Sequence, residues 1–261
     1  MKKRILGRTG IEVPELSMGG LFIASFGGPF EQARETVKKA LSVGIDFVDT
    51  APGYGDSEAV LGKIFETTGR PRVLSTKLGG YPQPFEPKNR KHLLSSVENS
   101  LKLLGTDHID ILIVHEPDRP GQYDWWDDYE NYAGPVTDVI DELKKSGKIK
   151  YSGLGGTTVT EMLPIVKTGK FDVLLTAFNY SLLWREAGRI LIPEAKAQGM
   201  GIILGSPLQQ GALARRYDET VKKGARWLSP HRREQYEKLY ALLDELGLDL
   251  AQTGMRFALS N

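Results

Sequence analysis

The 261-residue sequence contains no cysteine, which excludes disulfide bonds, thiolate metal sites and a cysteine nucleophile. It also lacks an excess of charge of either sign, because 34 basic and 33 acidic side chains leave a formal net charge of +1. This balance gives no electrostatic reason to expect nucleic acid or an anionic membrane as the main partner. Its apolar runs fall far short of the roughly 20 residues that cross a bilayer, and no apolar stretch follows the basic start. We therefore expect a cytoplasmic protein that binds neither nucleic acid nor membrane.

The few histidines give no sign of a metal site. His92, His108 and His231 lie in predicted helices or at their edges, without the spacing of metal ligands. The sequence therefore predicts no bound metal.

Strand-like and helix-like stretches alternate along the chain. Strands are predicted at residues 15–20, 46–50, 72–77, 109–115, 151–156, 172–178 and 200–207. Helices are predicted at residues 31–44, 57–66, 89–105, 136–148, 159–169, 185–199 and 231–247. Seven strands, each followed by a helix, indicate a parallel sheet with helical crossovers.

A (β/α)8 TIM barrel in a single domain, residues 1–261, is favoured over a doubly wound sheet. Candidate site residues close several successive strands, as barrel active sites require. No GxGxxG motif follows the first strand, where a dinucleotide-binding fold would carry it. Residues 3–13 are typical of a small N-terminal β-hairpin that turns at residues 8–10 and closes the barrel floor.

Four polar side chains lie where predicted strands end: Asp49, Tyr54, Lys77 and His115. Each residue taken alone has a plain structural explanation, such as a surface charge, a turn aromatic or a hydrogen-bonded core histidine. Together they are far more specific, because the carboxyl ends of neighbouring barrel strands meet on one face.

This set of groups suits proton transfer to or from a carbonyl oxygen. The pKa of a phenol is near ~10, and a nearby ammonium would lower it. Lys77 is the candidate for that ammonium, Asp49 for the carboxylate that holds it, and Tyr54 for the proton donor in reduction. Neutral His115 could orient the carbonyl. No side chain here supplies hydride, so a nicotinamide cofactor is implied.

Nearly the whole chain resembles the aldo-keto reductase superfamily. The resemblance is carried by LGRTGIEVPELSMGG, DFVDTAPGYGDSEAVLGK, LSTKLG, DILIVHEPD, LKKSGKIKYSGLGG and GSPLQQGALA. The second stretch, with Lys77 and His115 at the matching separations, is highly specific. GLGGTT and FNYSLL resemble the bacterial and plant aldose dehydrogenase branch. The resemblance implies a NADP(H)-dependent oxidoreductase (NAD(H) is the other candidate) that acts on an aldehyde, ketone or aldose. It also implies a monomer.

The resemblance further implies positions for the cofactor and the substrate. Cofactor contacts are expected from Gly20, Leu21, Asp49, Tyr180, Ser181, Ser206, Leu208, Gln210 and Gly211. Substrate contacts are expected from Phe22, Tyr54 and His115. In the long loop of residues 116–134, Trp125 and Trp126 either form an aromatic substrate wall beside an acidic run or pack on the barrel rim. A second long loop is expected at residues 211–230.

Two features depart from the family pattern. Residues 155–157 read Gly-Gly-Thr where the family commonly has Ser-Asn holding the carboxamide of nicotinamide, so Thr157 or backbone is expected to replace them. The sequence also stops at Asn261, before the eighth strand and the loop that binds the adenosine phosphate in the family. We therefore expect a barrel truncated before its eighth strand.

Two other functions remain open. Lys77 could act as the nucleophile of a Schiff-base aldolase on the same barrel. A non-enzymatic alternative is a cofactor-binding regulatory subunit with little turnover.

Overall fold

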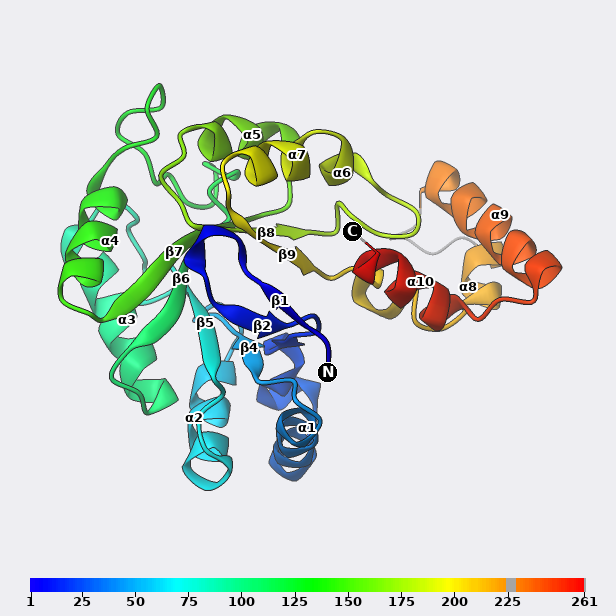
Figure 1. Cartoon of the computed structure of the whole chain (residues 1–261), viewed down its shortest axis with the longest axis horizontal. Helices are drawn as coiled ribbons and strands as arrows, with labels where there is room; N and C mark the ends of the chain where they lie inside the picture. The colour runs from blue at the N-terminus through cyan, green and yellow to red at the C-terminus, as the bar shows by residue number, and fades with distance from the viewer. Residues whose placement is uncertain (224–228, 261) are drawn as a thin grey trace.

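In the computed structural model, which describes residues 1–223 and 229–260, seven parallel strands form one curled sheet (Figure 1). The strands are β3 (Met18–Gly19), β4 (Phe47–Asp49), β5 (Val73–Leu78), β6 (Ile109–His115), β7 (Ile149–Gly156), β8 (Val173–Ala177) and β9 (Gly201–Gly205). Each strand pairs with its neighbour in sequence, so β3 and β9 form the two edges within the described residues. The predicted truncated barrel is confirmed as a half-barrel of seven strands.

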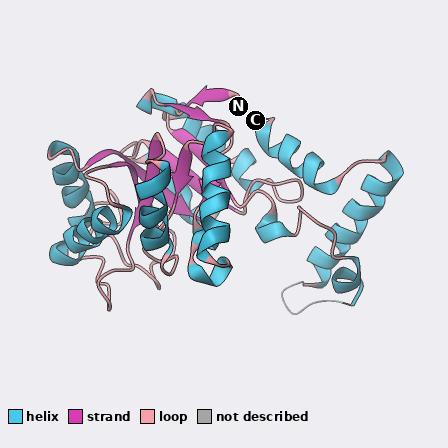
Figure 2. Cartoon of the chain, turned by 90° about the horizontal axis from the view of Figure 1, so that it is seen from below, coloured by secondary structure: helices cyan, strands magenta, loops and turns pink. Residues whose placement is uncertain are grey.

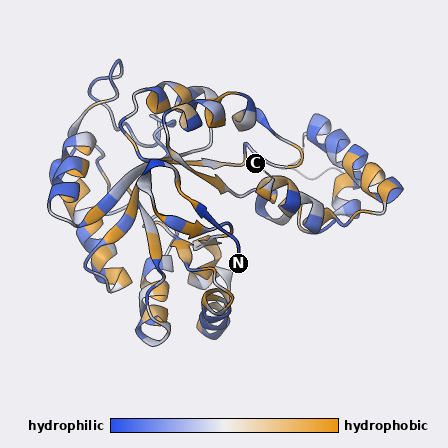
Figure 3. Ribbon diagram, viewed as in Figure 1, coloured by the Kyte–Doolittle hydropathy of each residue, from blue (hydrophilic) through white to orange (hydrophobic). Residues whose placement is uncertain are grey.

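Helices cover the outer face of the sheet, as Figures 1 and 2 show. They are α1 (Phe30–Ser42), α2 (Ser57–Thr68), α3 (Arg90–Leu104), α4 (Pro135–Lys145), α5 (Val159–Lys167), α6 (Glu186–Arg189) and α7 (Leu191–Ala197). The largest apolar core lies between β5–β9 and the helices α3, α4, α5 and α7. Figure 3 shows hydrophobic colour on most strands and on parts of the helices around them. The single helix predicted at residues 185–199 is divided, because Ile190 leaves helical geometry with φ −129° and ψ −60°.

The predicted N-terminal hairpin closes the floor of the half-barrel. Strands β1 (Lys3–Ile5) and β2 (Glu12–Pro14) pair antiparallel around a short 3-10 turn, η1 (Gly7–Thr9). Leu6 and Val13 insert their side chains into the interior cluster of the half-barrel. The hairpin thus occupies the end of the sheet where the strands begin, and leaves the opposite end for chemistry.

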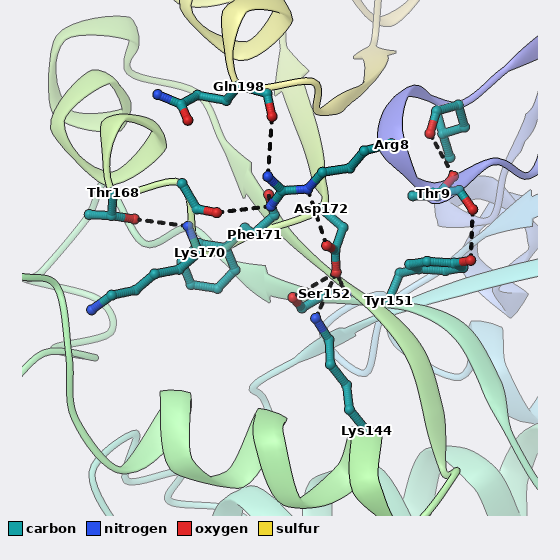
Figure 4. A network of polar contacts seen from close by, with 12 residues as sticks. Arg8, Thr9, Lys144, Tyr151, Ser152, Thr168, Lys170, Phe171, Asp172 and Gln198 are labelled. Carbon is teal, nitrogen blue, oxygen red and sulfur yellow. Dashed lines mark hydrogen bonds and ion pairs between the residues drawn. The ribbon is translucent and has the colours of Figure 1, made fainter.

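Arg8 fastens this hairpin to the loops before β8 and β9 (Figure 4). Its guanidinium donates hydrogen bonds to the carbonyls of Phe171 at 2.6 Å, Gly169 at 2.9 Å and Gln198 at 3.1 Å. The Nε atom of Arg8 lies 3.4 Å from Asp172, whose carboxylate also binds Lys144 at 2.7 Å. The floor is therefore held by charge-assisted bonds as well as by apolar packing.

Three C-terminal helices lie beside the β9 edge, apart from the other helices (Figure 1). They are α8 (Asp218–Lys223), α9 (Pro230–Leu246) and α10 (Leu250–Leu259), with an apolar cluster of their own. Phe257 of α10 stacks on Tyr180 with ring centroids 5.1 Å apart. Of these three only α9 was predicted; α8 falls in the predicted loop of residues 211–230, part of which lies outside the described residues. No helix in the described ranges has both the length and the apolar character of a membrane span.

Candidate active site

The buried ion pair of Lys77 and Asp49 forms the base of the site. Strands β4 and β5 run parallel, so their carboxyl ends bring the two side chains together. Lys77 Nζ donates to Asp49 Oδ2 at 2.7 Å and to the Thr50 carbonyl at 2.7 Å, while Ser75 Oγ donates to Asp49 Oδ1 at 2.8 Å. Burial alone would lower the pKa of Lys77, but the charges of Asp49 and Tyr54 outweigh it and leave the pKa raised. Lys77 therefore stays an ammonium at neutral pH.

Tyr54 lies in the turn that follows β4, directly beside this ammonium. The Lys77 Nζ atom is 4.7 Å from the centroid of the Tyr54 ring. Burial raises the pKa of Tyr54, and the charge of Lys77 lowers it only in part. The net pKa is above its ordinary value, whereas the sequence led us to expect a lowered one. The difference arises because the phenol loses water and also feels the negative charge of Asp49.

His115 closes β6 and lies next to Tyr54. The two rings meet edge to face with centroids 5.9 Å apart. Burial, followed by the charges of Lys77 and Arg119, lowers the pKa of His115 to about 3. The imidazole is therefore neutral at physiological pH and can donate one hydrogen bond without carrying charge. Trp125 Nε1 donates to the His115 carbonyl at 3.0 Å and so fixes this strand end.

The segment that follows β3 borders the same cluster. Gly20 N donates to the Asp49 carbonyl at 2.7 Å, and residues 21–23 form the 3-10 turn η2 (Leu21–Ile23). The Phe22 side chain is 63 % exposed, and its ring centroid is 6.4 Å from that of Phe26. Phe26 was not predicted as a neighbour of the site, because the sequence of a loop has no periodicity that shows where an aromatic side chain lies. Of the predicted cofactor and substrate contacts, Gly20, Leu21 and Phe22 thus lie on the loop beside the ion pair.

A cavity of about 460 Å³ lies at the carboxyl ends of β7, β8 and β9. Its lining includes the polar side chains of Thr157, Asn179, Glu186, Gln209, Gln210 and Arg232. Thr157 and Gln210 are among the residues expected from the sequence, whereas Asn179, Gln209 and Arg232 were missed. Arg232 could not be anticipated, because α9 reaches this rim only through the tertiary fold.

The backbone after β9 is unusual at the predicted cofactor residues. Ser206 and Gln210 have left-handed φ values of 50° and 54°, and Gly211 has φ 97°. Strained backbone of this kind gathers at ligand sites, and glycine adopts it without a steric penalty. Leu208 differs from the others, because its side chain packs into the apolar cluster of the C-terminal helices.

Two other predicted cofactor residues take packing positions. The Tyr180 ring is covered by Phe257 on one side and approaches Gly188 closely. Ser181 is fully buried, and its hydroxyl accepts a hydrogen bond from Trp184 N at 3.1 Å within the same turn. Both side chains thus have partners within the protein, and their expected position beside the nicotinamide stays a prediction.

Trp125 and Trp126 do not form an open substrate wall. They are 0 % and 1 % exposed and belong to the main apolar core. The expectation of a substrate contact at these residues is corrected. Burying two large indole rings in the apolar core is more favourable than exposing them on the loop. The alternative, packing at the barrel rim, describes both residues.

Similarity to known proteins agrees with this geometry. The model of the aldo/keto reductase family matches residues 16–261. The chain belongs to this family. It is 28 % identical to L-galactose dehydrogenase of Arabidopsis thaliana over 99 % of this chain and 80 % of that protein. It is 31 % identical to an uncharacterized oxidoreductase, YrpG, of Bacillus subtilis (strain 168), over 100 % of this chain and 84 % of that protein.

A solved structure is similar as well. The holo form of the aldo-keto reductase AKR11C1 from Bacillus halodurans matches with a TM-score of 0.68 and 26 % identity, over 83 % of this chain and 70 % of that one. As an aldo/keto reductase, the protein is an oxidoreductase, and a nicotinamide cofactor is the class that the family uses.

Proposed function

We propose that this aldo/keto reductase interconverts a carbonyl compound and its alcohol with NADP(H), and that Tyr54 is the proton donor in reduction. NAD(H) is the alternative cofactor. The observation that carries the proposal is the contact of Tyr54 with both the Lys77 ammonium and the His115 ring. The substrate class is a small aldehyde, ketone or aldose. The relative named L-galactose dehydrogenase supports an aldose within this class.

The residues divide the work as follows. Neutral His115 donates a hydrogen bond to the substrate oxygen and orients it. Protonated Tyr54 then gives its proton to the same oxygen, and Lys77 stabilises the phenolate that remains. Asp49 holds the ammonium of Lys77 in place. A reduced nicotinamide, when bound, supplies the hydride for the carbonyl carbon.

The residues at the β7–β9 rim fit a dinucleotide. The cavity combines amide side chains of Asn179, Gln209 and Gln210 with the guanidinium of Arg232 and the carboxylate of Glu186. Amides suit a carboxamide and ribose hydroxyls, and a guanidinium suits a phosphate. We assign the cofactor to this rim and to the loop at Gly20.

The aldolase alternative is disfavoured by the state of Lys77. A Schiff base requires a neutral amine with a free lone pair. Lys77 is instead paired with Asp49, and its pKa is raised. The regulatory subunit, in contrast to an enzyme, would bind the cofactor with little turnover, and the experiment below measures turnover.

The test is Tyr54→Phe, with carbonyl reduction followed by absorbance of the nicotinamide. We expect kcat to fall by about 10²–10⁴-fold, since a general acid contributes this much. Tyr151→Phe is the matched control, because its hydroxyl bonds to the Thr9 carbonyl on the barrel floor. Unchanged turnover in Tyr54→Phe would disprove the proposed role, and absence of turnover in the unmodified protein would favour the regulatory subunit.

The preferred nucleotide and the oligomeric state are two further parts of the proposal. Fluorescence titration with NADPH and NADH determines the preferred nucleotide. We expect a monomer, and sedimentation velocity measures its mass.

A further inference from the structure

We propose that Ser57, the first residue of α2, is a positioning residue. Its hydroxyl connects the segment after β3 to the residue after β4, Thr50, whose carbonyl binds Lys77. The inference rests on the proposed function, because it assigns Ser57 to the support of the same proton donor. A serine at a helix start ordinarily caps its own helix. Here α2 has Asp56 at its N-cap position and no side-chain cap bond, so another role has to explain the buried hydroxyl of Ser57.

The Ser57 hydroxyl bridges two other parts of the chain. Ser57 Oγ donates to the Gly20 carbonyl at 2.7 Å, and it lies 2.9 Å from Thr50 Oγ1. The side chain is fully buried, so water does not replace these partners. A serine hydroxyl has one proton, and the Gly20 carbonyl can only accept it. The Thr50 hydroxyl is therefore the donor to Ser57, and the chain of bonds runs Thr50 to Ser57 to Gly20.

Thr50 carries this link to the ion pair. Its backbone N donates to the Ser75 carbonyl at 2.9 Å, and its own carbonyl accepts from Lys77 Nζ at 2.7 Å. Every polar group of Thr50 is thus used, one of them on Ser57 and one on the ammonium. Loss of the Ser57 hydroxyl leaves the Thr50 hydroxyl and the Gly20 carbonyl without this shared partner. Thr50 is then held less firmly, and so is the Lys77 ammonium that its carbonyl binds beside Tyr54.

The other end of the link is the loop that we assign to the cofactor. Gly20 also donates its N–H to the Asp49 carbonyl at 2.7 Å. An added Cβ at Gly20 would lie 3.0 Å from Asp49 O, Ser57 Oγ and Thr50 Cβ, so the contact leaves little free space. A shift of residue 20 would carry residues 21–23 with it. Ser57 therefore couples nucleotide binding to the placement of the proton donor.

The experiment compares Ser57→Ala with Thr50→Val, which removes the other hydroxyl at nearly constant shape. For each variant we measure kcat/KM for reduction, the Kd for NADPH by tryptophan fluorescence, and the pH dependence of alcohol oxidation. We expect kcat/KM to fall roughly tenfold, as the loss of a buried hydrogen bond predicts. We also expect weaker nucleotide binding. The pH at which alcohol oxidation rises should move higher, because a less fixed Lys77 stabilises the Tyr54 phenolate less.

The double variant provides a second criterion. Both substitutions break the same chain of bonds, so their combined effect on kcat/KM should be close to that of either alone. Additive losses would overturn the shared link. If Ser57→Ala does not fold, the same measurements on Thr50→Val test the proposal.

Ser152→Ala is the matched control, since Ser152 is a buried serine on the barrel floor, where its hydroxyl bonds to Asp172 at 3.3 Å. It should lower the thermal midpoint only. The proposal is overturned if Ser57→Ala behaves like this control. In that case it changes the thermal midpoint but leaves kcat/KM, the Kd for NADPH and the pH profile as in the unmodified protein. Failure of the proposed function is seen separately, as full turnover in Tyr54→Phe.

Discussion

The Nζ atom of Lys77 lies 2.7 Å from Oδ2 of Asp49, and the two side chains are only 2 % and 12 % exposed. Such a pair is costly to break, because removal of one partner leaves the other charge buried and unpaired. The pair also keeps a positive charge beside Tyr54 that solvent cannot screen. The stability of the fold and the chemistry of the site therefore depend on the same contact.

Substitution of Asp49 by asparagine tests this dependence. We expect the free energy of unfolding to fall by about 3–5 kcal/mol, and the pKa of Lys77 to fall because the charge of Asp49 no longer opposes the effect of burial. Reduction activity should fall with it. Chemical denaturation and steady-state kinetics measure both effects. Glu12→Gln is the control, because its pair with Lys3 is about half exposed and should change stability by less than about 1 kcal/mol. An equally small change for Asp49→Asn would contradict the prediction.

The neutral state of His115 predicts a particular pH dependence. Its folded pKa is about 3, well below the ordinary 6.5. The unfolded chain therefore binds the proton more readily, and stability is lost as the pH falls from about 6.5 toward 3. Above pH 6.5 this contribution is constant. We expect His115→Gln to remove part of the acid sensitivity, measured as the unfolding free energy at pH 7 minus that at pH 4.5. An NMR titration of the imidazole near pH 6.5 in the folded protein would argue against it.

The Arg8 network predicts a loss of stability that leaves catalysis intact. Arg8→Met removes three hydrogen bonds to the carbonyls of Gly169, Phe171 and Gln198. We expect the free energy of unfolding to fall by about 1–3 kcal/mol, with kcat unchanged, because the site lies at the opposite end of the strands. Arg34→Met, which breaks only exposed ion pairs with Glu31 and Glu35, should stay within about 0.5 kcal/mol. Equal unfolding curves for the two variants would show that the network contributes nothing.

The contact between α2 and α3 predicts the effect of a single methyl group. A Cβ at Gly62 would lie 1.9 Å from the Leu103 carbonyl oxygen, so alanine there forces the helices apart. We expect Gly62→Ala to lower the thermal midpoint by several degrees, consistent with about 1–3 kcal/mol for overpacking. Gly121→Ala adds the same group where nothing lies within 4 Å, and should leave the midpoint nearly unchanged. Scanning calorimetry on both variants makes the comparison.

Much of the half-barrel could be predicted from the sequence because its signals are local. The strands β5 and β6 are short apolar runs that carry Lys77 and His115 at or next to their ends, and the helix between them, α3, has regular apolar spacing. The four-residue set followed from the same pattern, since polar side chains at strand ends stand out against apolar neighbours. The hairpin turn at residues 8–10 was equally visible.

The missed features depend on tertiary contacts. Helix α10 has Asp249 as its N-cap, whose side chain accepts from Gln252 N, and it packs at Gly254 beside Leu208 and Leu213. The pKa of Tyr54 was predicted with the wrong sign because burial cannot be read from a motif. The burial of Trp125 could not be read either, because a loop has no periodicity that shows which side chains face the core.

The attachment of Arg8 also bears on the order in which the chain can fold. Its carbonyl partners lie 161–190 residues downstream, so on a ribosome the N-terminal hairpin emerges long before the loops it binds. Contacts of such high sequence separation form slowly, because a long loop must close first. The beginning of the polypeptide would therefore dock among the last parts of the half-barrel, and until then its apolar side chains would be available to chaperones.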